Sequence, residues 1–183
     1  IGGLSMGGYI AMAVALRAPQ RVSHLILADT KMTADTDAIR AARDETRALV
    51  ERDGPAAVAT QMLPRLLGPT TQREQPDLSD AVRHLIQMNR TESIVGGLTA
   101  LKQRPDRAAT LGALRMPTLV LCGDEDVMTP PADSEAIART IPGARLVMIP
   151  RCGHMSNMEQ PAAFNTAIEE FLGSRITTSP EPA

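Results

Sequence analysis

Residues 1–8, IGGLSMGG, lead from an apolar residue through a glycine-flanked serine into an alanine-rich helical run. This pattern predicts a strand that turns sharply into a helix, with the hydroxyl of Ser5 at the corner, as in a nucleophile elbow. The chain before and after such a corner passes so close that side chains two positions away would collide, and Gly3 and Gly7 occupy these positions. The alternative interpretation is a glycine-rich helix start with Ser5 as an ordinary capping residue.

The predicted corner also places charge-stabilising groups beside the serine. A helix that begins near Met6 directs unpaired backbone N–H groups and the positive end of its dipole toward Ser5. A reacting carbonyl at Ser5 would therefore meet one oxyanion donor, the Met6 N–H.

Outside this corner, short apolar runs alternate with helical patterns at both ends of the chain. Such alternation predicts a parallel βαβ arrangement, in which fully buried strands read as continuous apolar runs. The expected strands are residues 22–28, 118–123 and 145–149, and the expected helices are residues 6–18, 133–140 and 162–172.

Residues 31–114 have a different character, polar and helical without a strand pattern. Amphipathic periodicity and proline or glycine breaks predict four helices here, and a segment of this length between two parallel strands indicates a separate cap. We expect a break at Gly54-Pro55, an early bend or end at Pro64, and a loop through GPTTQREQPD. The four expected helices are residues 37–53, 55–67, 79–89 and 92–103.

An activated serine needs a histidine base and an acid that orients it, and in a parallel sheet these residues follow strands. Of the three histidines, only His154 lies in a loop directly after a predicted strand, whereas His24 lies at a strand start and His84 on a helix. Three acids follow strands, Asp29, Asp124 and Asp126, and each could equally serve as a turn former. The order serine, acid, histidine suits one architecture of hydrolases.

Four stretches together resemble the α/β-hydrolase fold family from its nucleophile strand onward. The resemblance implies Ser5 as nucleophile, His154 as base and Asp126 as acid, because Asp126 stands third after the glycine of the family's G-x-x-D-x-x-T-P segment. Asp29 remains a rival, since some members carry the acid after the preceding strand. The stretches are GLSMGG (3–8), LILADT (25–30), PTLVLCGDEDVMTP (117–130) and GHMSNMEQPAAFN (153–165).

The resemblance also implies an architecture and an activity. We expect part of an α/β-hydrolase parallel sheet with helices on both faces, in residues 1–30 and 115–175, a helical cap in residues 31–114, and a disordered tail in residues 176–183. The family carries further strands and an oxyanion loop before the nucleophile, so we expect activity from a longer protein. The sequence around the predicted elbow and the histidine loop is similar to that of 3-oxoadipate enol-lactonases and related small-ester hydrolases. This similarity implies ester or lactone hydrolysis. Acyl transfer, perhydrolysis, carbon–carbon bond hydrolysis and a non-catalytic ligand receptor stay open as alternatives.

The amino-acid composition argues against several classes of binding partner. The formal net charge is −2, and only three of the 183 residues are aromatic, which argues against a nucleic-acid surface. The longest apolar runs are too short to span a membrane. The two cysteines, Cys122 and Cys152, form neither a disulfide framework nor a metal-ligand pattern, so we expect a cytoplasmic enzyme without cofactor or metal. The oligomeric state stays open.

Overall fold

The computed structural model describes residues 1–173, and the predicted tail lies outside this range. Four parallel strands form one sheet in the order β1-β2-β3-β4, which are Gly2–Leu4, Leu25–Ala28, Thr118–Gly123 and Arg145–Ile149. In this register Leu121 of the third strand lies between Ala28 and Val147 of its neighbours. The predicted α/β class with a parallel sheet is confirmed.

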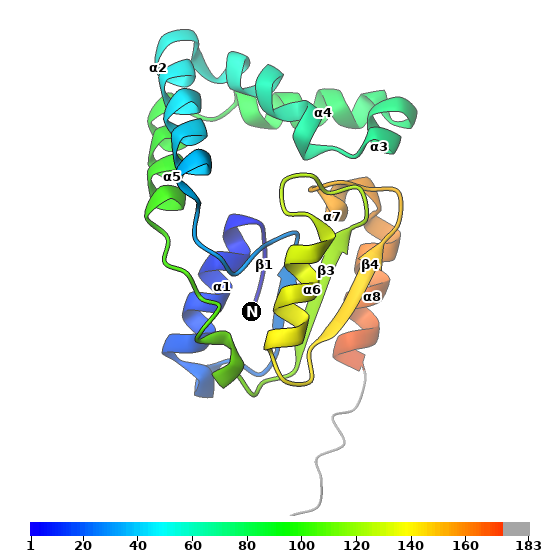
Figure 1. Ribbon diagram of the computed structural model, residues 1–183. Helices are drawn as coiled ribbons and strands as arrows, with labels where there is room; N and C mark the ends of the chain where they lie inside the picture. The colour runs from blue at the N-terminus through cyan, green and yellow to red at the C-terminus, as the bar shows by residue number, and fades with distance from the viewer. Residues whose placement is uncertain (174–183) are drawn as a thin grey trace, which may run out of the picture.

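Helices cover both faces of the sheet (Figure 1). On one face, α1 (Met6–Arg17) and α6 (Pro131–Thr140) enclose a core that includes Met12, Leu27 and Ile137. On the other face, α8 (Pro161–Gly173) packs Phe171 toward Leu119 and Leu121 of β3. Because every strand runs in the same direction, the loops that follow the strands gather at one end of the sheet.

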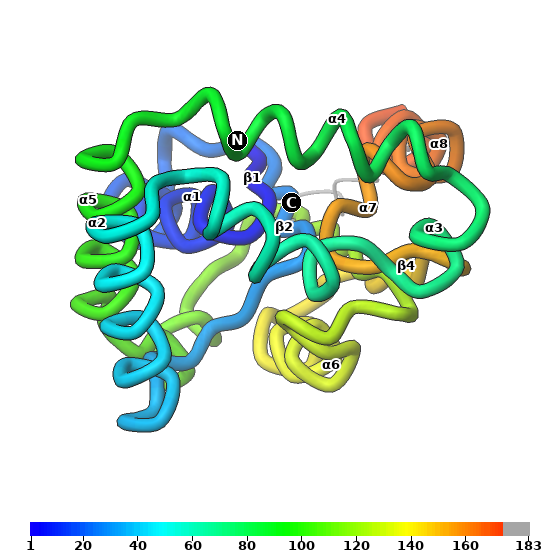
Figure 2. Tube along the Cα trace, turned by 90° about the horizontal axis from the view of Figure 1, so that it is seen from above, coloured from blue at the N-terminus to red at the C-terminus, as the bar shows by residue number. Residues whose placement is uncertain are grey.

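Four helices between β2 and β3 lie at that end of the sheet. The helices α3 and α4 extend across the top of Figure 1, and α5 and the first part of α2 stand together at one side, as Figure 2 also shows from above. We call α2 to α5 the helical layer. Within this layer α4 packs against α2, and Leu63, Leu67 and Val82 form a small buried cluster between them. The bounds are α2 Asp37–Leu66, α3 Pro69–Glu74, α4 Pro76–Gln87 and α5 Thr91–Gln103.

The break predicted at Gly54-Pro55 is confirmed, because Gly54 has a positive φ of 76° where two helical stretches meet within α2. Other predicted boundaries in the helical layer were wrong. The second stretch of α2 starts at Pro55 and continues past Pro64 to Leu66, without an early end. The stretch predicted as a loop contains α3 and the start of α4. Both helices have proline in their first turn, where its missing N–H costs no hydrogen bond.

Two short elements near the expected strands also differ from the prediction. β2 begins at Leu25 and not at the predicted residue 22. Residues Pro19–Arg21 form a 3-10 turn, and Val22 is the residue that ends it. The loop after β4 contains a four-residue helix, α7 (Ser156–Glu159). Within residues 1–173, no helix combines the length and the apolar character that crossing a membrane requires.

Candidate active site

Ser5 occupies the corner between β1 and α1 with a positive φ of 52°. Its N–H donates to the Ala28 carbonyl at 2.9 Å, and its own carbonyl accepts the Thr30 hydroxyl at 2.9 Å. The Ser5 side chain makes no capping hydrogen bond to α1, which argues against the capping interpretation. The corner is therefore held by the neighbouring strand, and the hydroxyl is free for another partner.

Two glycines make this corner possible, and one of them is not the predicted one. A Cβ on Gly3 would lie 2.1 Å from the Gly7 carbonyl carbon, so position 3 admits only glycine. A Cβ on Gly7 would meet no described atom within 4 Å, and the steric prediction for Gly7 was wrong. Gly8 is the restricted position, because α1 turns it toward the end of β2, where a Cβ would lie 2.6 Å from the Thr30 hydroxyl oxygen.

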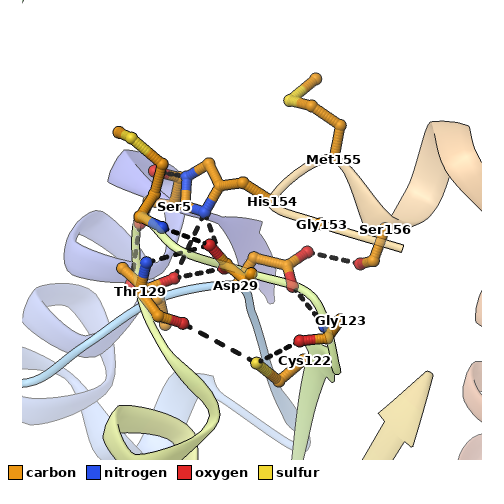
Figure 3. Close-up of polar contacts among 12 residues, drawn as sticks. Ser5, Asp29, Cys122, Gly123, Thr129, Gly153, His154, Met155 and Ser156 are labelled. Carbon is orange, nitrogen blue, oxygen red and sulfur yellow. Dashed lines mark hydrogen bonds and ion pairs between the residues drawn. The ribbon is translucent and has the colours of Figure 1, made fainter. Parts of the chain in front are cut away.

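His154 lies in the loop after β4 and is only 2% exposed. Its Nε2 is 2.8 Å from Ser5 Oγ, and its Nδ1 is 2.8 Å from Asp126 Oδ2. The backbone N–H of His154 donates to the Leu66 carbonyl of α2 at 3.0 Å. Ser5, His154 and Asp126 thus form one hydrogen-bonded line from three different strand ends. Figure 3 shows the imidazole of His154 beside Ser5.

Asp126 lies in the turn after β3, where its carboxylate is surrounded by donors. Oδ1 accepts the N–H groups of Met128 and Thr129 at 2.7 and 3.0 Å, and Oδ2 accepts the Thr129 hydroxyl at 2.7 Å. Burial by itself would raise the pKa of Asp126. The hydrogen bonds from His154 and Thr129 outweigh that effect, so the net pKa lies below its ordinary value. Asp126 is therefore held as an anion facing the imidazole.

The two rival acids have other partners. Asp29 is fully buried, accepts the Gly123 N–H at 3.0 Å and accepts a short hydrogen bond from the Ser156 hydroxyl. Burial raises the pKa of Asp29 to about 7. Asp124 is exposed and accepts the Arg151 N–H at 2.7 Å. Asp126 is the acid that the hydrogen bonds of the described residues join to His154 Nδ1.

The remaining histidines lie away from this line. His24 precedes β2 and its ring packs edge-on against Phe171, with centroids 5.5 Å apart. His84 is exposed on α4. Met6 is the first residue of α1, where the opening N–H groups of a helix have no partner within the helix. The Met6 N–H therefore lies next to Ser5 at the start of α1, and its role as an oxyanion donor stays a prediction.

The cysteines are buried thiols with raised pKa values. Burial raises the pKa of Cys122 to about 12 and also raises that of Cys152, so neither is primed as a thiolate nucleophile. Cys122 does lie near Asp29 and Asp126, with ligand atoms within 4.8 Å of one another. Both carboxylates already accept hydrogen bonds through both oxygens, and a metal would require the Cys122 thiolate. These three residues therefore do not suit a metal ion.

An apolar cavity of about 340 Å³ runs along α1 from the residue after Ser5. Its walls come from α1, from the segment after β2 and from the end of α5. Apolar side chains dominate the lining, and four cationic residues, Arg17, Lys31, Arg104 and Arg107, add positive charge. Tyr9 lies beneath Arg104, whose guanidinium carbon is 4.4 Å from the ring centroid.

Three polar residues near the triad were not predicted from the sequence. Thr129 bonds Asp126 and lies 3.3 Å from His154 Nδ1, and Ser156 bonds Asp29. Glu159 is buried beneath the loop of His154. Thr129 belongs to the quoted motif DEDVMTP and could have been found there. Ser156 bonds Asp29 of a distant segment, and Glu159 bonds both its own loop and Gly68 of the distant helical layer.

Known proteins share this arrangement of elements. The family model for the alpha/beta hydrolase fold matches residues 1–161. A thermophilic esterase from Thermogutta terrifontis, solved with malate bound, is 40% identical with a TM-score of 0.89 over 93% of this chain and 63% of that chain. The enol-lactonase from Burkholderia xenovorans LB400 is 26% identical with a TM-score of 0.84, over 93% of this chain and 64% of that chain.

Among curated relatives, 3-oxoadipate enol-lactonase 2 from Acinetobacter baylyi is 28% identical over 170 residues, which are 93% of this chain and 62% of that protein. The chain thus spans less than two thirds of the length of each of these three relatives.

Proposed function

The chain belongs to the α/β-hydrolase fold family, and we propose on this premise that its protein hydrolyses carboxylic esters or lactones with a Ser5–His154–Asp126 triad. The observation that carries the proposal is the pair of 2.8 Å distances that His154 makes to Ser5 Oγ and to Asp126 Oδ2. Both lie within the hydrogen-bonding range that a working base requires. The relatives named as an esterase and as enol-lactonases support the same reaction class.

The chemistry follows from this geometry. As Ser5 Oγ attacks the carbonyl carbon of the ester, His154 Nε2 takes the hydroxyl proton and the carbonyl oxygen becomes an oxyanion. The Met6 N–H donates to that oxyanion. When the tetrahedral intermediate collapses, the carbon–oxygen bond to the alcohol breaks and His154 returns the proton to the leaving oxygen.

A second half-reaction completes the turnover. Water attacks the acyl-enzyme, His154 takes one water proton, and breakage of the bond to Ser5 Oγ releases the carboxylic acid while the proton returns to the serine. Asp126 remains an anion throughout and stabilises the imidazolium in each half. The low pKa of Asp126 supports this role, because an anionic carboxylate favours the charged imidazole.

We further propose that residues 31–114 act as a cap over a core whose described residues are 1–30 and 115–173; the rest of the predicted core range, residues 174 and 175, lies outside the described residues. The helical layer supports this division, because it covers the strand ends that carry Ser5, Asp126 and His154 (Figure 1). The apolar cavity along α1 includes Met6, the chain neighbour of Ser5, but not Ser5 or His154, and its size suits the apolar part of a small ester or lactone. The buried thiols of Cys122 and Cys152 support a reducing, cytoplasmic location.

The direct test is Ser5→Ala in the full-length enzyme, assayed with short p-nitrophenyl esters. Loss of the nucleophile should reduce turnover on the order of 10⁴-fold to 10⁶-fold while circular dichroism shows an intact fold. Mass spectrometry of the wild type mixed with a slow ester should show an acyl adduct on Ser5, and Ser5→Ala should show none. Retention of more than about a tenth of the turnover would refute the triad. Tight ligand binding by a wild type without turnover would favour the receptor alternative.

A further inference from the structure

Glu159 is a buried carboxylate that the proposed chemistry does not use. It ends α7, is 2% exposed, and lies close to His154 in the chain. Among residues 1–173, its bonds are to backbone N–H groups, and no lysine or arginine forms an ion pair with it. A buried carboxylate is costly unless donors surround it, and its three N–H partners offset that cost.

The three N–H groups belong to two separate segments. Glu159 Oε2 accepts the Gly153 N–H at 2.9 Å, and Oε1 accepts the Met155 N–H at 3.1 Å. These are the residues immediately before and after His154. Oε2 also accepts the Gly68 N–H at 2.8 Å, which belongs to the turn between α2 and α3 of the helical layer. One carboxylate thus fixes the main chain on both sides of His154 and joins it to the layer.

Three glycines bring these segments into backbone contact. A Cβ on Gly153 would lie 2.4 Å from the Gly68 nitrogen, and a Cβ on Gly123 would lie 2.2 Å from the Gly153 carbonyl oxygen. We call Gly68, Gly123 and Gly153 the glycine stack. The stack leaves no space for side chains between the end of β3, the His154 loop and the helical layer. The carboxylate of Glu159 bonds two of its three members.

We propose that Glu159 is a positioning residue that holds the imidazole of His154 between Ser5 and Asp126 and couples it to the helical layer. The inference rests on the proposed triad. Fixing the peptide groups on both sides of His154 restricts the direction of its Cα–Cβ bond, and both imidazole hydrogen bonds depend on that direction. A displacement of about 1 Å in a reacting group can cost on the order of 100-fold in rate.

Replacement of Glu159 by glutamine provides a defined perturbation of these contacts. A glutamine has nearly the same shape, but one of its two oxygens becomes an NH₂ group. Because both carboxylate oxygens accept N–H groups, the amide must direct a donor at the Met155 N–H or at the N–H groups of Gly68 and Gly153. At least one buried N–H next to His154 then lacks an acceptor.

A matched control exists on the surface between the same two segments. Glu74 of α3 forms an ion pair with Arg151 of the His154 loop, and both side chains are largely exposed. Glu74→Gln therefore removes a link between the helical layer and the loop without changing the bonds beside His154. Exposed pairs of this kind contribute little to stability.

The experiment compares Glu159→Gln, Glu159→Asp and Glu74→Gln in the full-length enzyme. We measure kcat and KM for p-nitrophenyl butyrate, the melting temperature, and the low-field proton NMR signal of the hydrogen between His154 Nδ1 and Asp126. Glu159→Gln should lower kcat about 10-fold to 100-fold at a temperature where it is folded, with KM changed less than about threefold. Its low-field signal should broaden or disappear. Glu74→Gln should match the wild type in both readouts.

Other outcomes separate the possible failures. An unchanged kcat and an intact low-field signal in Glu159→Gln would overturn the positioning role, as would a kcat that falls only with the folded fraction. If Glu159→Gln does not fold, Glu159→Asp decides, because its shorter carboxylate cannot reach all three N–H groups and should give the same pattern more weakly. A wild type without esterase activity would refute the proposed function, and the low-field signal would still decide the role of Glu159.

Discussion

The sheet core and the helical layer are held together in different ways. All six residues of β3 are buried, whereas α5 has thirteen residues and none of them is buried. The core is fixed by apolar packing on both faces of the sheet. The layer depends on a small apolar cluster and on its contacts with the strand ends. The consequence is that substitutions of the same type should be costly in the core and mild in the layer.

Charged groups show the same contrast. In the core, Asp126 and Glu159 are buried and accept hydrogen bonds from backbone N–H groups. In the layer, pairs such as Arg47–Glu51 are about half exposed. An exception is Asp35, which is buried at the start of the layer between Arg43 and Arg104. Buried charges with several donors restrict geometry, whereas exposed pairs are screened by water and salt.

The largest expected contrast comes from adding one methyl group to a glycine. Gly3→Ala should destabilise the core by more than about 4 kcal/mol, because its Cβ would overlap the backbone of Gly7. Gly96→Ala in α5 should stabilise the protein by about 0.5–1 kcal/mol, because the site is open and alanine favours helix. Urea unfolding of both variants measures the difference. A folded Gly3→Ala protein of wild-type stability would contradict the packing described for the corner.

Truncation of leucines should give the next largest contrast. Leu121 lies in the middle of β3 and is fully buried, so Leu121→Ala should cost about 3 kcal/mol through lost burial and a cavity. Leu85 on α4 is 49% exposed, and Leu85→Ala should change the free energy of unfolding by less than about 1 kcal/mol. Equal losses in the two variants would show that the layer contributes to the core more than its burial indicates.

The buried acids of the core predict a pH dependence. The pKa of Asp29 is raised from 3.8 to about 7, so between these values the folded protein keeps a proton that the unfolded chain releases. Stability from this group therefore falls as pH rises from about 4 to 7, by up to about 1.4 kcal/mol per pH unit. The lowered pKa of Asp126 acts only below its ordinary range and with the opposite sign.

Asp29→Asn isolates this contribution. Its free energy of unfolding should lose most of the decline that the wild type shows between pH 5 and pH 6, measured by urea titration at constant ionic strength. The amide can still accept from Gly123 through its oxygen, so the packing is preserved. Parallel pH curves for the two proteins would show that Asp29 is ionised in the folded state at pH 5.

The smallest effect is expected for the exposed charges of the layer. Arg47→Ala removes the pair with Glu51 and should change the free energy of unfolding by less than about 0.5 kcal/mol. Adding 0.5 M salt to the wild type should produce a change of similar size. A loss above about 1 kcal/mol for Arg47→Ala would remove the distinction between the two regions.

The sequence predicted those elements that a continuous stretch of residues specifies by its own pattern. The bounds of β3 and β4 agree with the predicted runs, because buried parallel strands are continuous apolar segments. The helix starts at Pro69 and Pro76 were missed because proline was interpreted as a breaker and not as a first-turn residue. The short helix α7 had too few residues to show a period.

The residues of the candidate site also differ in whether the sequence predicts them. Ser5 and His154 stand out from the sequence pattern itself, whereas Asp126 could be separated from Asp29 and Asp124 only through the resemblance to the hydrolase family. Gly8 took the role expected of Gly7 because the contact is with Thr30, on the neighbouring strand end. The partners of Glu159 include Gly68, far away in the sequence, and no local pattern predicts such a pairing.

The glycine stack has a consequence for the recombination of this fold with its relatives. Exchanging the helices between β2 and β3 is an obvious way to change specificity, and a junction in the turn after α2 would look harmless in an alignment. Gly68 packs on Gly153 without space for a Cβ, so a donor segment with any other residue there would push the His154 loop outward. Productive chimeras should therefore keep Leu67 and Gly68 with the recipient and place their crossovers within the exposed turns of α4 and α5.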